Sequence, residues 1–289
     1  MKKKLSLLLV LVMVFSIFIT ACGDKGANDN GSDKGADVGN GKDVEDTKDE
    51  LTSQDIIDKG KLIMGTNAEY PPFEFHILVD GKDEIVGLDI EIAKYIANEL
   101  GVELEIKDMD FGNLLGALDT GMIDVAIAAM NPDPDRDANF TDIYYEVNHG
   151  VLVHKDNDAG ITSLEDLNGK KIGVQRGTVQ EEIANNEIQD AEVISLDKNS
   201  DAVMNLKTKK VDCIIMEAPV AKSYAQANDD IMVAEGIDID SGTDGVAIAV
   251  KTGNDELTEK LNEIIADMIS QGLIEKWFVE AEELSNEAL

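Results

Sequence analysis

Residues 89–106 read DIEIAKYIANELGVELEI, and the change of periodicity inside this stretch decides the fold class. Apolar residues first recur at helical spacing, at Ile92, Ala93, Ile96, Ala97 and Leu100. From residue 102 they alternate with polar residues instead, which is typical of a strand with one buried face. A helix that passes directly into a strand indicates an α/β fold.

The segments on either side continue this pattern. Residues 62–65 and 123–129 are short apolar runs, as expected of buried strands, and residues 113–118 have the length of a helix that ends before Gly121. The resulting β-α-β-α-β order predicts a mostly parallel sheet with helices on both faces.

The pattern then restarts. We expect strands and helices in turn over residues 163–167, 171–174, 179–185, 193–196, 200–206 and 211–216. A strand over residues 245–251 precedes a long helix whose apolar stripe includes Leu257, Leu261, Ile264, Ile265, Met268 and Ile269. Two α/β units predict two lobes with a cleft between them, where a ligand lies at the carboxyl ends of strands and beside helix N-termini.

The N-terminal segment differs in composition. Three lysines precede an apolar run over residues 5–20, which is shorter than the roughly 20 residues of a spanning helix. We therefore expect a secretory signal over residues 1–21. The motif Ile19-Thr20-Ala21-Cys22 resembles a bacterial lipoprotein signal, so Cys22 should carry acyl chains (palmitate among them) that anchor the protein on the extracytoplasmic face of the cell membrane. Residues 22–50 are polar and Gly-rich, which predicts a flexible tether.

Composition excludes several classes of function. The chain has 289 residues and a formal charge of −34, which argues against nucleic-acid binding because phosphate contacts need clustered cations. Besides Cys22 only Cys213 remains, which we expect to be a core residue with no disulfide or metal role. His149 and His154 should point to opposite faces of one strand, so no metal site follows. Motifs of hydrolases and nucleotide-binding enzymes are absent from the sequence.

Five segments carry a family resemblance by their order and spacing. They are GTNAEYPPFE (residues 65–74), GLDIEIA (87–93), GMIDVA (121–126), PDR with FTDIYY (134–136 and 140–145) and GVQRGT (173–178). Together they make residues 60–278 similar to the polar-amino-acid-binding proteins of bacterial ABC importers, family 3 of the extracellular solute-binding proteins. The loop after Arg136 is about two residues shorter than is usual in that family.

The resemblance implies a two-lobed periplasmic-binding-protein fold of type II, with two crossing hinge strands near residues 146–147 and 242–243. The first lobe would comprise residues 51–146 and 243–289, and the second residues 147–242. The implied partners are a free amino acid and the importer permease with its cytoplasmic ATPase. The chain would be a monomer without a cofactor.

The resemblance also implies one partner for each charged group that all amino acids share. Arg136 would bind the substrate carboxylate with its planar fork, helped by the backbone of Thr178 and Val179. Glu217, at the end of an apolar strand, would bind the ammonium, with a salt bridge to Lys222 as the alternative role. Ala129 and Asn131 would contact the same head group.

The side-chain end of the substrate should be bordered by residues from both lobes. Tyr70 and Phe73 would pack against it, and Leu88 stands where many family members have an aromatic residue. Asn67, Glu69, Glu74 and Gln175 are the polar candidates, and their carboxylates favour arginine or lysine. Glutamine is the second candidate and cystine the third. A secreted enzyme on the same fold and a receptor sensing domain are the alternative classes of protein.

Overall fold

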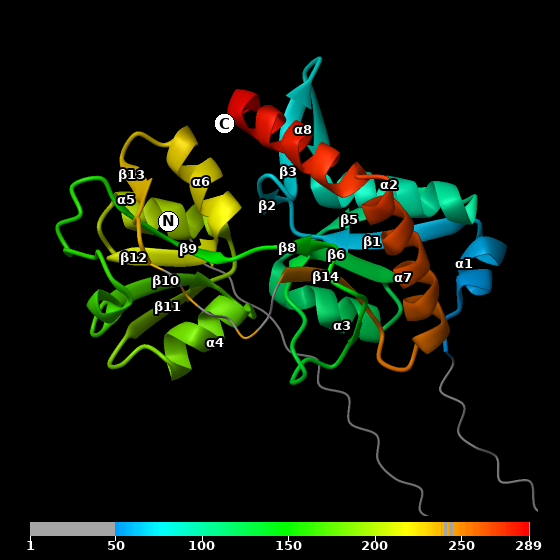
Figure 1. Cartoon of the computed structure of the whole chain (residues 1–289), viewed down its shortest axis with the longest axis horizontal. Helices are drawn as coiled ribbons and strands as arrows, with labels where there is room; N and C mark the ends of the chain where they lie inside the picture. The colour runs from blue at the N-terminus through cyan, green and yellow to red at the C-terminus, as the bar shows by residue number, and fades with distance from the viewer. Residues whose placement is uncertain (1–49, 238, 240–241, 243–244, 289) are drawn as a thin grey trace, which may run out of the picture. The chain divides into compact units, whose positions relative to one another are not determined.

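The computed structural model describes residues 50–237, 239, 242 and 245–288, drawn as ribbons in Figure 1. The expected signal peptide, Cys22 and the tether up to residue 49 lie outside the described residues, as does Thr243 at the second expected crossing. Among the described helices, none is long and apolar enough to cross a membrane.

The first sheet runs in the order β5-β1-β6-β14-β7, with β8 paired to β14. Its strands are β1 (Lys61–Thr66), β5 (Glu103–Asp108), β6 (Val125–Met130), β7 (Asn139–Phe140), β8 (Tyr145–Glu146) and β14 (Gly245–Val250). The pairs of β1 with β5 and β6 are parallel, whereas β14 is antiparallel to its neighbours. The sheet is therefore mixed, because the chain returns from the second lobe to add β14 in the opposite direction.

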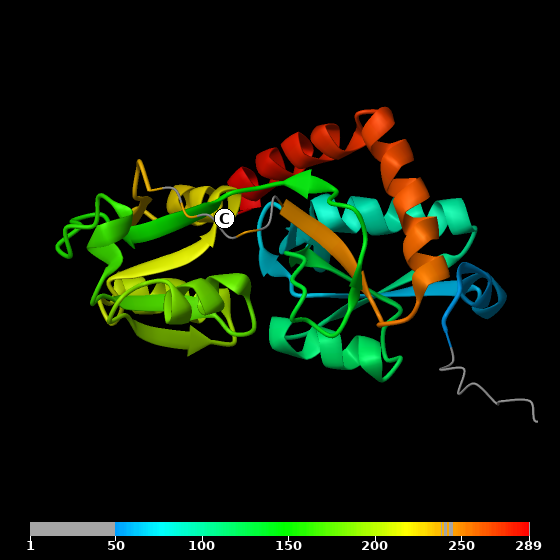
Figure 2. The same ribbon diagram turned by 60° about the horizontal axis from the view of Figure 1, so that its bottom comes forward.

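Helices cover both faces of this sheet (Figure 2). Leu62 and Met64 of β1 lie in the same core cluster as α2 (Leu88–Leu100), while Ile63 lies in the cluster of α3 (Leu114–Asp119). This division follows from the strand geometry, in which successive side chains point to opposite faces. The remaining helices of this lobe are α1 (Ser53–Lys59), the 3₁₀ helix η1 (Phe111–Asn113) and α7 (Asp255–Ser270).

The second sheet has the order β11-β10-β12-β9-β13. Its strands are β9 (His149–His154), β10 (Lys171–Gln175), β11 (Glu192–Leu196), β12 (Cys213–Glu217) and β13 (Ile231–Val233), and its helices are η2 (Leu164–Leu167), α4 (Val179–Asn186), α5 (Asn199–Lys207) and α6 (Ala218–Ala227). Strand β10 is parallel to β11 and β12, and β9 is antiparallel to β12 and β13. Cys213 has no exposed surface and packs in the core on the face that α4 covers.

A small antiparallel sheet and a C-terminal helix complete the described chain. The sheet has three strands, β2 (Glu69–Tyr70), β3 (Glu74–Val79) and β4 (Lys82–Val86), and is called the hairpin below. The helix is α8 (Leu273–Ala288). Helix α8 contacts α2, α7 and β3 as well as α6 of the second lobe. Phe278 of α8 stacks on Tyr145 with ring centroids 4.3 Å apart, which fixes α8 beside β8.

The chain passes from the first sheet to the second through Val147 and Asn148, between β8 and β9. This is the position at which the sequence places the first crossing. The second crossing would involve Thr243, outside the described residues, so the exact lobe boundaries stay a prediction. Below, "first lobe" and "second lobe" mean the elements packed around the first and the second sheet.

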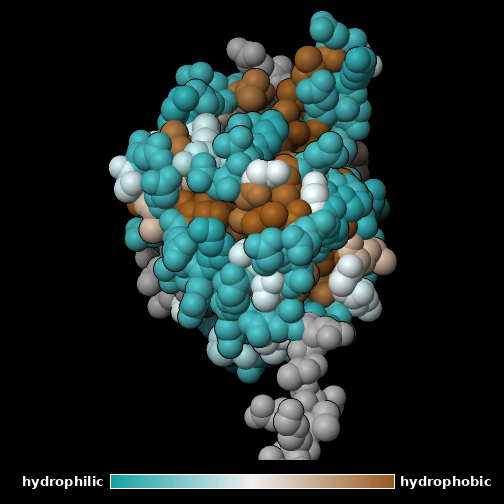
Figure 3. All heavy atoms as spheres, turned by 90° about the vertical axis from the view of Figure 1, so that its right-hand side faces the viewer, coloured by the Kyte–Doolittle hydropathy of each residue, from teal (hydrophilic) through white to brown (hydrophobic). Residues whose placement is uncertain are grey.

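The surface is largely polar on the side of the molecule shown in Figure 3. Hydrophilic residues cover most of this face, and hydrophobic residues gather in a band across its middle. Exposed apolar side chains are common on protein surfaces. This band therefore carries no functional assignment by itself.

Candidate functional site

A small polar cavity lies where strand ends of the two lobes meet. Its free volume is only about 10 Å³, which is room for about one water molecule and far below the roughly 300–1,000 Å³ of sites for drug-sized ligands. Its lining residues are Asn67, Tyr70, Glu74, Phe111, Ala128, Ala129 and Asn131 of the first lobe and Gln175, Thr178, Gln180 and Glu217 of the second. The polar lining suits a small, charged metabolite, for which the lobes or the lining side chains would have to move apart.

Parallel strands explain why these residues come together. Asn67 directly follows β1, Asn131 directly follows β6, and Gln175 and Glu217 are the last residues of β10 and β12. Parallel strands bring their carboxyl ends to one edge of a sheet, which is where ligands bind in open α/β folds. The two edges face each other across the cleft.

Glu217 is the buried acid of the second lobe. It is 1% exposed, and its carboxylate accepts hydrogen bonds from the Tyr70 hydroxyl and, at 2.9 Å, from Gln180 Nε2. Burial raises the pKa of Glu217 to about 8. Lys222, the alternative partner considered from the sequence, instead pairs with Glu282 at 2.8 Å. A ligand cation against Glu217 would favour its charged form.

Glu74 is the buried acid of the first lobe. It is 1% exposed, and within the part of the chain that the structure describes its Oε2 atom has no hydrogen-bond partner. Burial, and then the neighbouring Asp89, raise the pKa of Glu74 well above its ordinary value. The cavity therefore has a carboxyl group in each lobe, and both would become more acidic beside a cation.

Asp89 is a buried neighbour of Glu74 and binds the backbone of the lining residue Ala129. It accepts hydrogen bonds from the Ala129 N–H at 2.7 Å and from the Tyr144 hydroxyl at 2.8 Å, and burial raises its pKa to about 6. Ala129 has a φ of 45°, a conformation that is costly for residues other than glycine. The hydrogen bond to Asp89 helps to hold this strained backbone at the cavity.

Arg136 lies beside the cavity and contacts both lobes. Its Nη2 atom donates to the Gly177 carbonyl of the second lobe at 3.0 Å, and its guanidinium carbon lies 5.7 Å from the Phe111 ring centroid. The Nη1 atom is buried and has no hydrogen-bond partner among the described residues, and burial lowers the pKa of Arg136. Gly177 immediately precedes Thr178, the N-cap of α4. An anion between Arg136 and this helix N-terminus would meet both a guanidinium group and backbone N–H groups.

Two amide side chains join the lobes directly. Gln175 Nε2 donates to Asn67 Oδ1 at 2.7 Å, and Asn67 in turn donates to the Met109 carbonyl at 3.0 Å. The amide nitrogen of Asn131 donates to the Gly245 carbonyl at 3.1 Å. Its amide oxygen therefore points away from Gly245. These amides could exchange their present partners for polar groups of a ligand.

The structure places the residues expected from the sequence in two groups. Eight line the cavity, namely Asn67, Tyr70, Glu74, Ala129, Asn131, Gln175, Thr178 and Glu217. Five do not, namely Glu69, Phe73, Leu88, Arg136 and Val179.

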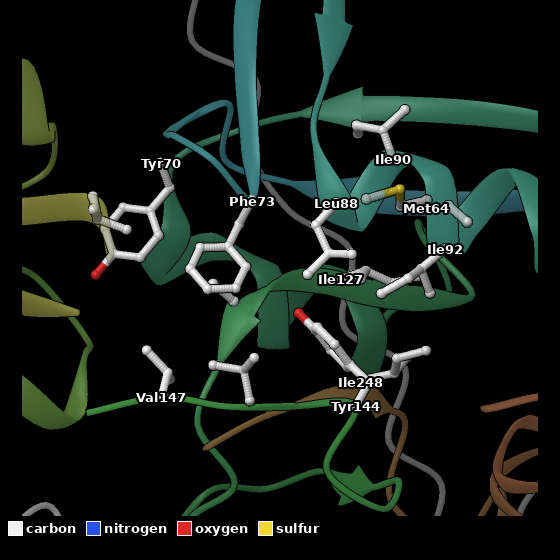
Figure 4. Close-up of a cluster of buried hydrophobic side chains, with 14 of the residues drawn as sticks. Met64, Tyr70, Phe73, Leu88, Ile90, Ile92, Ile127, Tyr144, Val147 and Ile248 are labelled. Carbon is white, nitrogen blue, oxygen red and sulfur yellow. The ribbon is translucent and has the colours of Figure 1, made fainter. Parts of the chain in front are cut away.

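Among those five, Phe73 and Leu88 have no exposed surface and pack in the core (Figure 4). Their distance from the lining has a simple reason. The ring of Phe73 packs against those of Tyr145 and Phe278, and Leu88 points toward Ile127 of β6. The Tyr70 hydroxyl instead reaches Glu217 of the second lobe. The Glu69 carboxylate bonds outside the cavity, to Ser200.

Three lining residues were not among those expected. Phe111 begins the 3₁₀ helix η1 after β5, Ala128 lies within β6, and Gln180 lies in the first turn of α4. The rule that strand ends and helix N-termini meet at the cleft would have found Phe111 and Gln180. Among the described residues, no group of three or more His, Cys, Asp or Glu side chains could hold a metal ion.

Residues 62–280 match the model of the bacterial extracellular solute-binding proteins, family 3. The chain belongs to this family. The resemblance and the two-lobed type II fold expected from the sequence are thereby confirmed. The family consists of solute-binding proteins rather than enzymes, which removes the secreted enzyme from the alternatives.

Individual relatives cover most of the chain. The arginine-binding extracellular protein ArtP of Bacillus subtilis is 37% identical over 96% of this chain and 98% of its own length. The L-cystine-binding protein TcyJ of Escherichia coli is 31% identical over 82% of this chain and 90% of its own. Both relatives are binding proteins of small amino-acid ligands.

Solved structures agree with this assignment. The substrate-binding protein AbpA of Streptococcus pneumoniae, bound to L-arginine, superposes with a TM-score of 0.77 at 37% identity, over 80% of this chain and 98% of that chain. The holo form of ArgBP from T. maritima gives 0.68 at 34% identity, over 78% of this chain and 99% of its own. As a member of an extracellular family, the protein acts outside the cytoplasm.

Proposed function

We propose that this protein is the amino-acid-binding component of an ABC importer, and that it captures arginine or lysine and delivers it to the permease. The observation that carries the proposal is the charge pattern of the cleft. Two buried carboxyl groups, Glu217 and Glu74, line the cavity from opposite lobes. Arg136 does not line it, but its guanidinium group lies 5.7 Å from the ring centroid of the lining residue Phe111. A substrate with two cationic groups and one carboxylate matches this pattern.

In the proposed complex, Arg136 and the first turn of α4 bind the substrate carboxylate, and Glu217 binds the ammonium. Glu74 then pairs with the cationic end of the side chain, and the ring of Tyr70 packs against the same cation, with a cation–π contribution of about 0.5–2 kcal/mol. Of the two acids considered for this role from the sequence, Glu74 lines the cavity and Glu69 does not. Relatives that bind arginine support this substrate class.

Glutamine is the second candidate, because Asn67 and Gln175 form an amide pair at the cavity that a carboxamide could replace. Cystine is the third, supported by the similarity to TcyJ. A thermal-shift screen over the twenty amino acids, ornithine, citrulline and cystine tests the class. A ligand at 100 times its dissociation constant should add about 2.7 kcal/mol to the free energy of unfolding. A screen in which no amino acid raises the melting temperature would contradict the proposed function.

We further propose that the protein is lipid-anchored through Cys22, and that its two lobes close over the ligand about the crossing strands. The anchor rests on the motif Ile19-Thr20-Ala21-Cys22. Hinge closure is supported by the hydrogen bonds that join the lobes across the cavity. Small-angle scattering should show a smaller radius of gyration with ligand than without it.

A further inference from the structure

Glu69 joins the two lobes at a point outside the cavity. It lies in β2 of the first lobe, and its Oε2 atom accepts hydrogen bonds from the Ser200 N–H at 3.2 Å and the Ser200 hydroxyl at 3.0 Å. Ser200 is in the first turn of α5, in the second lobe. The carboxylate thus reaches across the cleft to a helix N-terminus.

Among the described residues, none of the second lobe caps this helix with its side chain. Its N-cap residue, Lys198, makes no side-chain capping hydrogen bond. The first N–H groups of a helix lack partners within the helix, and a carboxylate is favourable there because of the helix dipole. Glu69 therefore gives α5 a cap that its own sequence does not provide. Lys198 Nζ adds an exposed ion pair at 3.8 Å, which contributes little.

The backbone of Glu69 is held by the second lobe as well. The hydroxyl of Tyr224, in α6, donates to the Glu69 carbonyl at 2.7 Å, and Tyr224 is only 9% exposed. One residue of the first lobe is thus bonded to two helices of the second lobe. None of these bonds uses an atom that lines the cavity.

We propose that Glu69 is a positioning residue that stabilises the closed arrangement of the lobes by capping α5, without touching the ligand. This inference rests on the proposed function, in which the ligand is held between closed lobes. A contact that forms only when the lobes meet shifts the population toward the closed state. Apparent affinity falls in proportion to the fraction of protein in the binding-competent state. Loss of Glu69 should therefore weaken every ligand alike.

Calorimetry with arginine, lysine and glutamine on three variants tests this. Glu69→Ala should weaken all ligands that bind by the same factor, roughly threefold to thirtyfold, as expected for the loss of a helix cap. Glu69→Gln keeps an acceptor oxygen and should recover most of the loss. Glu74→Gln is the matched comparison, because its loss should be confined to arginine and lysine.

Two results would overturn the inference: unchanged affinities in Glu69→Ala, or a loss in that variant restricted to the cationic ligands, which would make Glu69 a direct ligand contact. If the unmodified protein binds none of the three amino acids, the proposed function fails, and hydrogen exchange on the free protein decides the role of Glu69. Faster exchange of the Ser200 amide in Glu69→Ala would support the cap, and equal exchange would refute it.

Discussion

The hydroxyl of Tyr70 donates a hydrogen bond to the carboxylate of Glu217, and this bond joins the two lobes at the centre of the cleft. Tyr70 belongs to the hairpin of the first lobe and Glu217 to the end of β12 in the second. Glu217 is thus tied to both lobes, and the proposed ammonium of the substrate would enter beside a carboxylate that is already oriented.

The first prediction concerns the two residues proposed for the common head group. Arg136→Ala and Glu217→Ala should each cost about 3–5 kcal/mol of binding free energy, because each leaves a buried charge without its partner. That cost corresponds to roughly two to four decades in dissociation constant. Calorimetry measures it, with circular dichroism to verify folding.

The matched control for Arg136 is Arg176→Ala. Arg176 directly precedes Gly177, whose carbonyl Arg136 contacts, but its side chain is exposed and pairs with Asp197 at 2.7 Å. Its removal should leave the affinity nearly unchanged. Losses of tenfold or less in both Arg136→Ala and Glu217→Ala would refute the proposed pairing.

The second prediction concerns selectivity. Glu74→Gln should weaken arginine and lysine by roughly tenfold to a hundredfold, as expected for one charge-assisted hydrogen bond of about 1.5–3 kcal/mol, and should affect glutamine much less. Glu84→Gln on the exposed strand β4 is the control within the same hairpin. Equal losses for arginine and glutamine in Glu74→Gln would remove Glu74 from the side-chain site.

The third prediction is a pH dependence of stability without ligand. The pKa of Glu217 is raised to about 8 in the folded protein, so the folded state binds its proton more tightly than the unfolded state. The free energy of unfolding should therefore fall as pH rises toward 8. Between pH 6.5 and pH 8 this group should contribute a loss of about 1–2 kcal/mol.

Other buried groups with shifted pKa values limit the pH range in which the effect of Glu217 can be measured. The pKa of Asp89 is raised to about 6, so it adds a loss in the same direction mainly below pH 6.5. The pKa of His149 is lowered to about 4, which opposes this trend in acid. Denaturant unfolding at pH 6.5 and pH 8 should show a smaller pH dependence in Glu217→Gln than in the unmodified protein, and an identical dependence would contradict the role of Glu217.

The fourth prediction concerns the membrane anchor. Cys22→Ser should accumulate as an unprocessed precursor without acyl chains, because the proposed lipid attachment requires the thiol of this residue. Mass spectrometry of the N-terminal peptide and fatty-acid labelling report both properties. Cleavage before residue 22 together with continued lipid labelling in the variant would exclude the assignment.

The sequence predicts well those site residues that lie at the ends of strands. Asn67, Asn131, Gln175 and Glu217 follow or end apolar strands, and parallel pairing brings all four to the cavity. The strand and helix order was also predictable, because the periodicity changes clearly between residues 89 and 106. The antiparallel pairing of β9 and β14 was not, since a strand pattern carries no direction.

The side-chain directions in the hairpin could not be predicted from the sequence. Neighbouring residues of β2 and its turn point in different directions, so Tyr70 reaches Glu217, Glu69 caps α5 and Phe73 enters the core. These directions depend on how the hairpin packs on α2 and on the second lobe. Spacing along the sequence does not contain that information.

Competition calorimetry with arginine, lysine and glutamine on the unmodified protein tests the central claim most directly. Because each lobe contributes a buried carboxyl group to the cavity, arginine or lysine should bind at least tenfold more tightly than glutamine. Glutamine binding at least tenfold more tightly than both arginine and lysine would contradict the assignment of a cationic substrate.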